Sequence, residues 1–352
     1  MGVGIRLALL VPLLVSAGGS GGDRAPVALE EVVIELTAGQ ASEFSYAPGA
    51  DRVAYRLDWA EGRVGLWVCD RPKEQHFHVV PEVADERVHV LALSPDGGHL
   101  AYMRTSAEAP PRLLGVGVVG IESGRKLELP GTAAAWTGKG DRLAVADPSG
   151  GVISVVEVPS METRIVTKTP RAGDPYEQPC LAWSPDGSRL AYTISEPEGP
   201  MTSIWVVPAE GGDARLAVTD GEGCASLVPF WSPDGRLAWR LTNVDDPAGT
   251  RHYVQEADAQ VRELGKGVPL NLAGGPSWRP DGSAIVFART VEPTESTGVS
   301  TTDLWELDVA SGELRRLTDA GDASGEVVWS PTGGMVWLTD GRRLRSARLG
   351  AR

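Results

Sequence analysis

The chain has 352 residues, with 33 lysines and arginines against 47 aspartates and glutamates, and therefore a formal net charge of −14. This acidic balance argues against nucleic acid as the main partner, because phosphate binding depends on clustered cations. Hydrophobic residues make up 42% of the sequence, which is enough for a large core and excludes a disordered chain. The 43 glycines and 26 prolines follow no collagen-like period, and they favour many short strands joined by turns.

The first segment, residues 1–17, is typical of a secretory signal peptide. It has one early cation, Arg6, then an apolar stretch that ends in small residues, with cleavage expected after Ala17. A membrane anchor is the alternative, but the apolar run is about half the roughly 20 residues that span a bilayer, and Pro12 interrupts it. Residues 18–29 are interpreted as a linker. We therefore expect a periplasmic or extracellular protein without a membrane span.

From residue 46 onward one phrase of nine or ten residues recurs, and it contains a Ser-Pro-Asp-Gly turn or a close relative. Successive copies start 43 to 51 residues apart, a period typical of repeat architectures. The seven copies are YAPGADRVAY (46–55), LSPDGGHLAY (93–102), WTGKGDRLAV (136–145), WSPDGSRLAY (183–192), WSPDGRLAW (231–239), WRPDGSAIVF (278–287) and WSPTGGMVW (329–337).

Each phrase predicts a β-hairpin. An apolar residue ends one strand, Pro-Asp-Gly reverses the chain, and the next residues alternate between polar and apolar as a strand does. The repeated aspartates are expected to stabilise their own turns, and the repeated tryptophans to pack between repeats. These positions are Asp96, Asp186, Asp234 and Asp281, and Trp136, Trp183, Trp231, Trp278 and Trp329.

Two further strand signals follow most hairpins, so that each repeat has four strands, as does a propeller blade. The sequence predicts an all-β fold: a β-propeller of seven four-stranded blades, with six or eight as alternatives. The last repeat lacks its outer strand. The segment Glu30–Leu36 fits as that strand, and would close the ring by joining the first and last blades. Residues 30–352 are accordingly expected to form a single domain.

The W-S-P-D-G repeats, followed by R-L-A-Y or a relative, resemble those of the TolB-like propellers, over about residues 30–349. Related repeats occur in the propellers of prolyl oligopeptidases and in oligogalacturonate lyase. The resemblance implies the propeller fold. TolB itself has an additional amino-terminal domain, which we do not expect here because only about a dozen residues separate residues 1–17 from the first expected strand. The resemblance therefore implies the fold strongly and a role in the Tol system only weakly.

Catalytic motifs are absent from the sequence. The stretch Gly120–Gly124 places its serine one position late for a Gly-x-Ser-x-Gly nucleophile elbow, and no phosphate-binding loop occurs in a strand-to-helix context. We assign no catalytic residue, no metal ligand and no cofactor. The sequence leaves enzymatic activity open but favours a protein that is not an enzyme.

Histidines and cysteines leave a few alternatives open. His76 and His78 lie two apart on an expected outer strand and could share a metal, although no third ligand accompanies them. His89 is the histidine placed nearest the propeller axis. Three cysteines leave at least one thiol unpaired; a Cys180–Cys224 disulfide is possible, but three buried thiols are preferred.

The loops that lead into the inner strands combine acids with apolar groups, and could bind a basic or amphipathic peptide. The candidate binding residues there are Asp174, Tyr176, Glu177, Phe230 and Glu326. We expect an exported, monomeric, non-catalytic scaffold with a protein or peptide partner. The alternative is a carbohydrate-active propeller, a polyuronate lyase or a glycan binder, that uses an axial pocket.

Overall fold

The computed structural model is all-β. It describes residues 6–7, 29–32, 34–35, 41–57, 64–147, 149–169, 179–195, 202–219, 225–243, 250–256, 259–264, 277–291, 301–318, 327–329, 335–339 and 344–348. Within these residues no helix is long and apolar enough to cross a membrane. The chain divides into two compact units: unit 1 (Met1–Ala41, Ala248–Arg251 and Leu264–Arg352) and unit 2 (Ser42–Pro247 and His252–Glu263).

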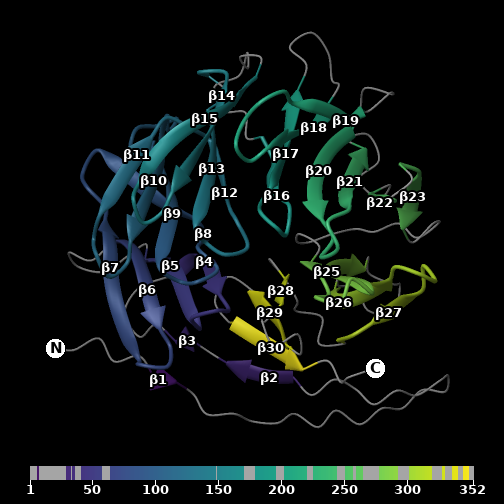
Figure 1. Ribbon diagram of the computed structural model, residues 1–352. Helices are drawn as coiled ribbons and strands as arrows, with labels where there is room; N and C mark the ends of the chain where they lie inside the picture. The colour runs from purple at the N-terminus through teal and green to yellow at the C-terminus, as the bar shows by residue number, and fades with distance from the viewer. Residues whose placement is uncertain are drawn as a thin grey trace. The chain divides into compact units, whose positions relative to one another are not determined.

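Unit 2 contains five antiparallel sheets, each made of four consecutive strands (Figure 1). The sheets are β4 (Ala41–Ala47), β5 (Arg52–Leu57), β6 (Gly65–Asp70) and β7 (Gln75–Pro81); β8 (Glu86–Leu93), β9 (His99–Ser106), β10 (Leu113–Gly120) and β11 (Lys126–Leu129); β12 (Ala133–Trp136), β13 (Arg142–Asp147), β14 (Val152–Glu157) and β15 (Glu162–Lys168); β16 (Leu181–Trp183), β17 (Arg189–Ser195), β18 (Thr202–Pro208) and β19 (Arg215–Thr219); β20 (Ala225–Trp231), β21 (Leu237–Asn243), β22 (Arg251–Gln255) and β23 (Val261–Leu264).

The repeated phrase forms the hairpin that the sequence predicts. In the fourth copy Trp183 pairs with Leu190 across β16 and β17, and Gly187 in the turn has a φ of 69°. The Asp186 carboxylate accepts hydrogen bonds from the Ser184 hydroxyl (2.6 Å) and the Ser188 backbone N–H (3.0 Å). These bonds hold the pKa of Asp186 well below its usual range. The structural role expected for this aspartate is confirmed.

The repeated tryptophans join neighbouring sheets, as predicted. Trp183 donates its indole N–H to the backbone oxygen of Ala135 in the preceding sheet, at 3.0 Å. In two hairpins the arginine that starts the second strand adds a further link. Arg142 stacks over the Trp183 ring, 5.1 Å from its centroid, and donates to the Gly187 backbone oxygen at 2.8 Å. Arg189 repeats both contacts one sheet later, with Trp231 and Gly235.

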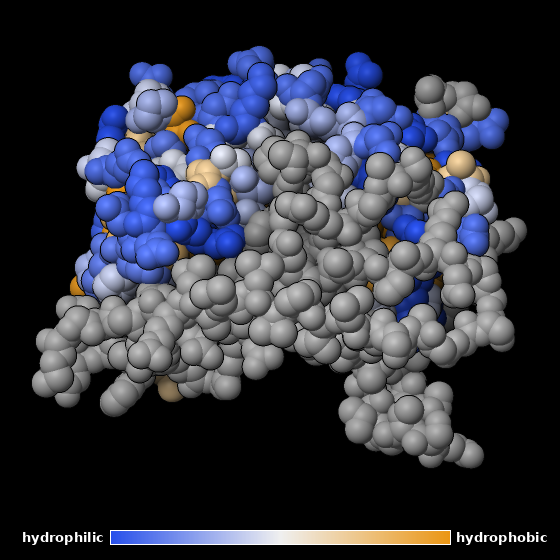
Figure 2. Space-filling model, turned by 90° about the horizontal axis from the view of Figure 1, so that it is seen from below, coloured by the Kyte–Doolittle hydropathy of each residue, from blue (hydrophilic) through white to orange (hydrophobic). Residues whose placement is uncertain are grey.

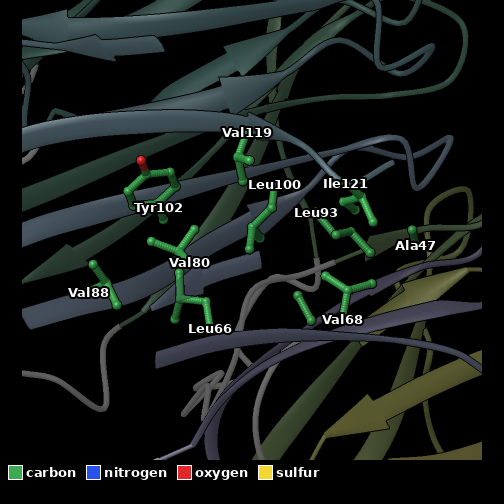
Figure 3. Packing of buried hydrophobic residues seen from close by; sticks show 11 residues of the cluster. Ala47, Leu66, Val68, Val80, Val88, Leu93, Leu100, Tyr102, Val119 and Ile121 are labelled. Atoms are coloured by element: carbon green, nitrogen blue, oxygen red, sulfur yellow. The ribbon is translucent and has the colours of Figure 1, made fainter. Parts of the chain in front are cut away.

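Apolar side chains fill the space between consecutive sheets of unit 2. Figure 3 shows this packing between the first two sheets, where Leu66 and Val80 lie close to Leu100 and Tyr102. Corresponding clusters lie between the second and third, third and fourth, and fourth and fifth sheets. The residues alternate along each strand, so that each sheet buries one row of side chains against the sheet before it and one against the sheet after it.

Unit 1 contains one more sheet of four consecutive strands, a four-stranded sheet that combines the two ends of the chain, and a short pair of strands. The first has β24 (Ser277–Trp278), β25 (Ala284–Val291), β26 (Thr301–Asp308) and β27 (Leu314–Arg316); the second has β2 (Leu29–Val32) beside β30 (Leu344–Arg348), then β29 (Met335–Thr339) and β28 (Val327–Trp329); the pair is β1 (Arg6–Leu7) with β3 (Ile34–Glu35).

The amino-terminal strand therefore supplies the outer strand that the last repeat lacks. Strand β2 runs antiparallel to β30, and Leu29 lies opposite Ala347. The expected pairing is confirmed for Glu30–Val32, the first part of the predicted segment, whereas Ile34–Glu35 pairs with β1. In the same unit Trp329 donates its indole N–H to the Ser277 backbone oxygen at 3.2 Å, the same link that joins the sheets of unit 2.

Candidate functional site

Four of the five predicted binding residues lie outside the described residues: Asp174, Tyr176, Glu177 and Glu326. The fifth, Phe230, lies within β20, opposite Ala238 on β21, and not in the loop that leads into this strand as expected; it is half-buried. Its ring meets the edge of the His252 ring, with centroids 6.0 Å apart and an interplanar angle of 73°. The grouping of the five residues into one surface stays a prediction.

Within the described part of unit 2, charged side chains gather where β4 and β5 meet β8. We call this group the polar junction: Glu43 on β4, Arg56 on β5, Glu82 directly after β7, and Arg87 and His89 on β8. None of these side chains belongs to the repeated phrase, although Arg56 directly follows its first copy. They lie at the ends of β4 and β8 that the loops from outer strands lead into, where the sequence places the binding surface.

Glu43 is the most constrained member of the polar junction. Its φ of 53° is in the left-handed region, which residues other than glycine seldom adopt. Its Oε2 accepts the Val90 backbone N–H at 2.9 Å, and its Oε1 lies 2.7 Å from His89 Nδ1. Both carboxylate oxygens are therefore fixed against β8, while about 32% of the side chain stays exposed. Strained backbone of this kind often marks a position where a side chain is placed for a purpose.

The two arginines of the polar junction share one carboxylate. Arg56 donates to Glu82 Oε2 at 3.0 Å, and Arg87 lies 3.0 Å from Glu82 Oε1. The Glu82 and Arg56 side chains are nearly buried, with 9% and 12% exposed, whereas Arg87 is 42% exposed. A carboxylate with an arginine on each oxygen is held in a single orientation. Only the outer parts of Arg87, Glu43 and His89 therefore face solvent.

The hydrogen bonds of His89 assign its tautomer. Nδ1 lies 2.7 Å from Glu43 Oε1 and 3.2 Å from Arg56 Nη1, and an arginine can only donate. The shorter contact, to a carboxylate, places the proton on Nδ1. In the neutral ring Nε2 then accepts from the Thr105 hydroxyl, 3.2 Å away. Both nitrogens are thus engaged, and the arrangement is better suited to binding and positioning than to proton transfer.

The sequence placed His89 near the propeller axis and Arg87 in a loop that leads into an inner strand, but Glu43, Arg56 and Glu82 were missed. One feature of the sequence could have pointed to them: Leu93 stands at the tryptophan position in the second repeat. Without an indole, the junction between the first two sheets needs other hydrogen bonds. The Leu93 backbone N–H donates to the Ser45 hydroxyl at 2.9 Å, beside the Glu43–Val90 bond.

The two histidines considered as metal ligands are engaged in the first sheet. They share one face of β7, as predicted, but the His78 ring stacks on Trp67 with centroids 4.5 Å apart. His76 Nδ1 lies 3.1 Å from the Tyr55 hydroxyl, and burial lowers the pKa of this histidine. In the described ranges no group of three or more histidine, cysteine, aspartate or glutamate side chains could hold a metal ion.

Cys69 and Cys180 carry free thiols, and Cys224 lies outside the described residues. Cys69 is buried beside His76, and burial raises its thiol pKa to about 11. The thiol is therefore protonated at neutral pH and is a poor nucleophile. Of the described cysteines, Cys69 fits the interpretation of a buried apolar thiol.

Comparisons with known proteins agree with this architecture. No family model matches the chain. A 189-residue stretch is 26% identical to the uncharacterized peptidase YuxL of Bacillus subtilis and covers 44% of this chain and 28% of that protein. A 49-residue stretch is 43% identical to the Tol-Pal system protein TolB of Anaeromyxobacter dehalogenans and covers 14% and 10% of the two chains.

Among solved structures, the β-propeller domain of the trilobed protease from Pyrococcus furiosus matches with a TM-score of 0.58 at 14% identity, over 90% of this chain and 97% of that one. The chain has a β-propeller fold. Oligogalacturonate lyase in complex with manganese shares the fold, with a TM-score of 0.58 at 12% identity over 99% of both chains. The matched stretch of the chain spans less than a third of the length of the peptidase relative. Such distant similarity shows the fold and not the activity.

Proposed function

We propose that this TolB-like propeller is an exported, non-catalytic scaffold that binds a protein or peptide segment. One observation carries the proposal: the polar junction holds partly exposed Glu43, Arg87 and His89 on strands whose positions are fixed by hydrogen bonds and ion pairs. Rigid presentation of polar groups keeps the entropic cost of binding low. Tyr176 and Phe230 are the proposed aromatic anchors, with Asp174, Glu177 and Glu326 attracting a basic or amphipathic ligand.

We also propose that the four-stranded sheets form a closed ring of seven blades. The sheets of consecutive strands would be blades, and the sheet that joins β2 to β28–β30 would be the seventh blade and close the ring. The pairing of β2 with β30 supports closure, because it lets one blade take strands from both ends of the chain. We also propose that residues 1–17 direct export and that the mature protein is monomeric.

The carbohydrate-active alternative has a specific requirement. A polyuronate is anionic, so that a chain of net charge −14 needs a bound cation or unpaired basic groups to accept it. In the polar junction both arginines are already paired with Glu82. This pairing favours the peptide-binding function over the lyase.

The test is a binding selection with the purified mature protein and a library of random peptides displayed on phage. We expect enriched peptides to be basic or amphipathic, and Tyr176→Ala and Phe230→Ala each to weaken binding of the synthetic peptide by about tenfold or more. A matched control is Trp205→Phe, which changes an aromatic residue within β18. Failure to enrich any peptide, together with release of unsaturated products from polygalacturonate, would overturn the proposal and establish the lyase.

A further inference from the structure

The junctions between consecutive sheets of unit 2 are of two kinds. In three of them a tryptophan indole N–H donates to a backbone oxygen of the preceding sheet, at 3.0 Å each. These bonds are Trp136 to Ala92, Trp183 to Ala135, and Trp231 to Ala182. They are neutral hydrogen bonds between largely buried groups, and dissolved salt has little effect on them.

The junction between the sheets β4–β7 and β8–β11 is different, because Leu93 stands where the other junctions have the tryptophan. Its inner edge is held by side chains that accept backbone N–H groups of β8. Glu43 Oε2 accepts Val90 at 2.9 Å, and the Ser45 hydroxyl accepts Leu93 at 2.9 Å. Ion pairs complete it. Arg87 on β8 pairs with Glu82 at 3.0 Å, and at the other end of the sheets Arg52 pairs with Glu122 at 2.9 Å.

Several of these charged groups are open to solvent. Glu122 is 72% exposed and Glu43 is 32% exposed. The screening length of dissolved salt falls from about 10 Å at 0.1 M to about 3 Å at 1 M, so that exposed pairs weaken as salt rises. Glu43 also has an unfavourable φ of 53°, which its bonds to β8 must offset. When those bonds weaken, the backbone strain favours release of the strand.

Apolar clusters lie between the sheets at all four junctions, so the distinguishing feature of the first is its inner edge. We infer that the polar junction is a salt-controlled seam, which opens more readily than the three junctions that have a tryptophan hydrogen bond. Opening frees the edge of β8 at Val90 and Leu93, two backbone donors whose partners are side chains and not another strand.

Hydrogen–deuterium exchange of the full chain, read by mass spectrometry, tests this inference. At about 1 M NaCl, peptides that contain Val90 to Leu93 are expected to exchange about three- to tenfold faster than at about 0.05 M. Peptides that contain Leu181 to Trp183, at a junction held by an indole, are expected to exchange at nearly the same rate in both. These peptides also report any loosening of the whole protein.

Two variants separate charge from hydrogen bonding. Glu43→Gln removes the charge, and is expected to make exchange at Val90 fast at both salt concentrations. Ser45→Ala is the matched control, since it removes an uncharged acceptor. It is expected to speed exchange at Leu93 equally at both concentrations and to leave the salt effect at Val90 in place. Equal salt ratios at the two junctions, or a Glu43→Gln protein with the full salt ratio of the wild type, would overturn the inference.

Discussion

Trp183 and Ala135, 48 positions apart, are joined by a 3.0 Å hydrogen bond from the indole N–H to a backbone oxygen of the preceding sheet. Because the same bond links Trp136 to Ala92 and Trp231 to Ala182, a single residue of the repeated phrase forms the link between sheets. The repeated tryptophan therefore has a physical role. Its indole N–H pairs with a backbone carbonyl at the edge of the preceding inner strand, which would otherwise have no partner.

We expect Trp183→Phe to lower the free energy of unfolding by about 1–2 kcal/mol. The phenylalanine keeps most of the packing but leaves the Ala135 carbonyl without its donor. Urea unfolding followed by circular dichroism measures the change. Trp205→Phe is the control, because its indole N–H donates to the Ser203 hydroxyl within one sheet, at 3.0 Å. A loss for Trp183→Phe no larger than that of the control would show that the link between sheets contributes little.

Asp70 is expected to make stability depend on pH. Although burial by itself would raise the pKa of Asp70, hydrogen bonds from Lys73 and Arg52 hold it below the usual range. A depressed folded-state pKa stabilises the protein above the unfolded value of about 3.9, and this contribution is lost as the pH falls through the folded value. Asp70→Asn is expected to cost about 3 kcal/mol at pH 7, because it leaves the buried Arg52 without its buried charge partner and with only the exposed Glu122.

The difference in unfolding free energy between wild type and Asp70→Asn should therefore shrink as the pH falls below about 4. Denaturant titrations at several pH values measure it. Asp213→Asn is the control, since Asp213 is exposed, and its difference from the wild type should be small throughout. If the Asp70→Asn difference widened toward acid, the assigned direction of the pKa shift would be wrong.

Gly117 is expected to tolerate no side chain. A Cβ at this position would overlap the Tyr102 ring, which lies over the glycine where other sheets have Trp67 and Trp205 beside their tyrosines. We expect Gly117→Ala to destabilise the protein by about 1–3 kcal/mol through overpacking. Thermal unfolding measures the loss. In a double-mutant cycle with Tyr102→Leu, the alanine should cost clearly less. An equal cost in both backgrounds would mean that backbone conformation, and not the ring, excludes the side chain.

Metal content gives a further test of the proposed function. We expect the purified protein to hold no stoichiometric metal, and its melting temperature to be unchanged by a chelator, since the described residues offer no group of three ligands. Elemental analysis and thermal shift with and without EDTA measure this. A bound metal whose removal lowers the melting temperature would point to the carbohydrate-active alternative.

Figure 2 shows one face of the molecule, on which the described residues are mostly hydrophilic with scattered apolar side chains. The exposed large hydrophobic residues include Ile165 on β15 and Leu216 on β19, each on the outer strand of its sheet. Single exposed apolar residues of this kind are common on soluble proteins and mark no site by themselves.

The repeats alone were sufficient to predict the hairpins, their turn aspartates, the packing of the tryptophans and the strand that β2 adds to the last sheet. These features depend on residues close in the sequence or on a period, and alternation and turn chemistry report both directly. The ends of strands and the bulges, such as the one that leaves Leu114 out of register with β9, were not visible, because they depend on neighbouring strands.

Most of the candidate site, in contrast, was not predictable from the sequence. The sequence by itself determined that the protein is built of repeated four-stranded sheets, because periodic turns and alternating side chains carry that information locally. Only the tertiary structure decided that Glu43 and His89, 46 positions apart and outside any motif, meet at 2.7 Å. The absence of a tryptophan at Leu93 is visible in the sequence, but which side chains replace its hydrogen bond depends on distances between strands, and these exist only once the sheets have packed.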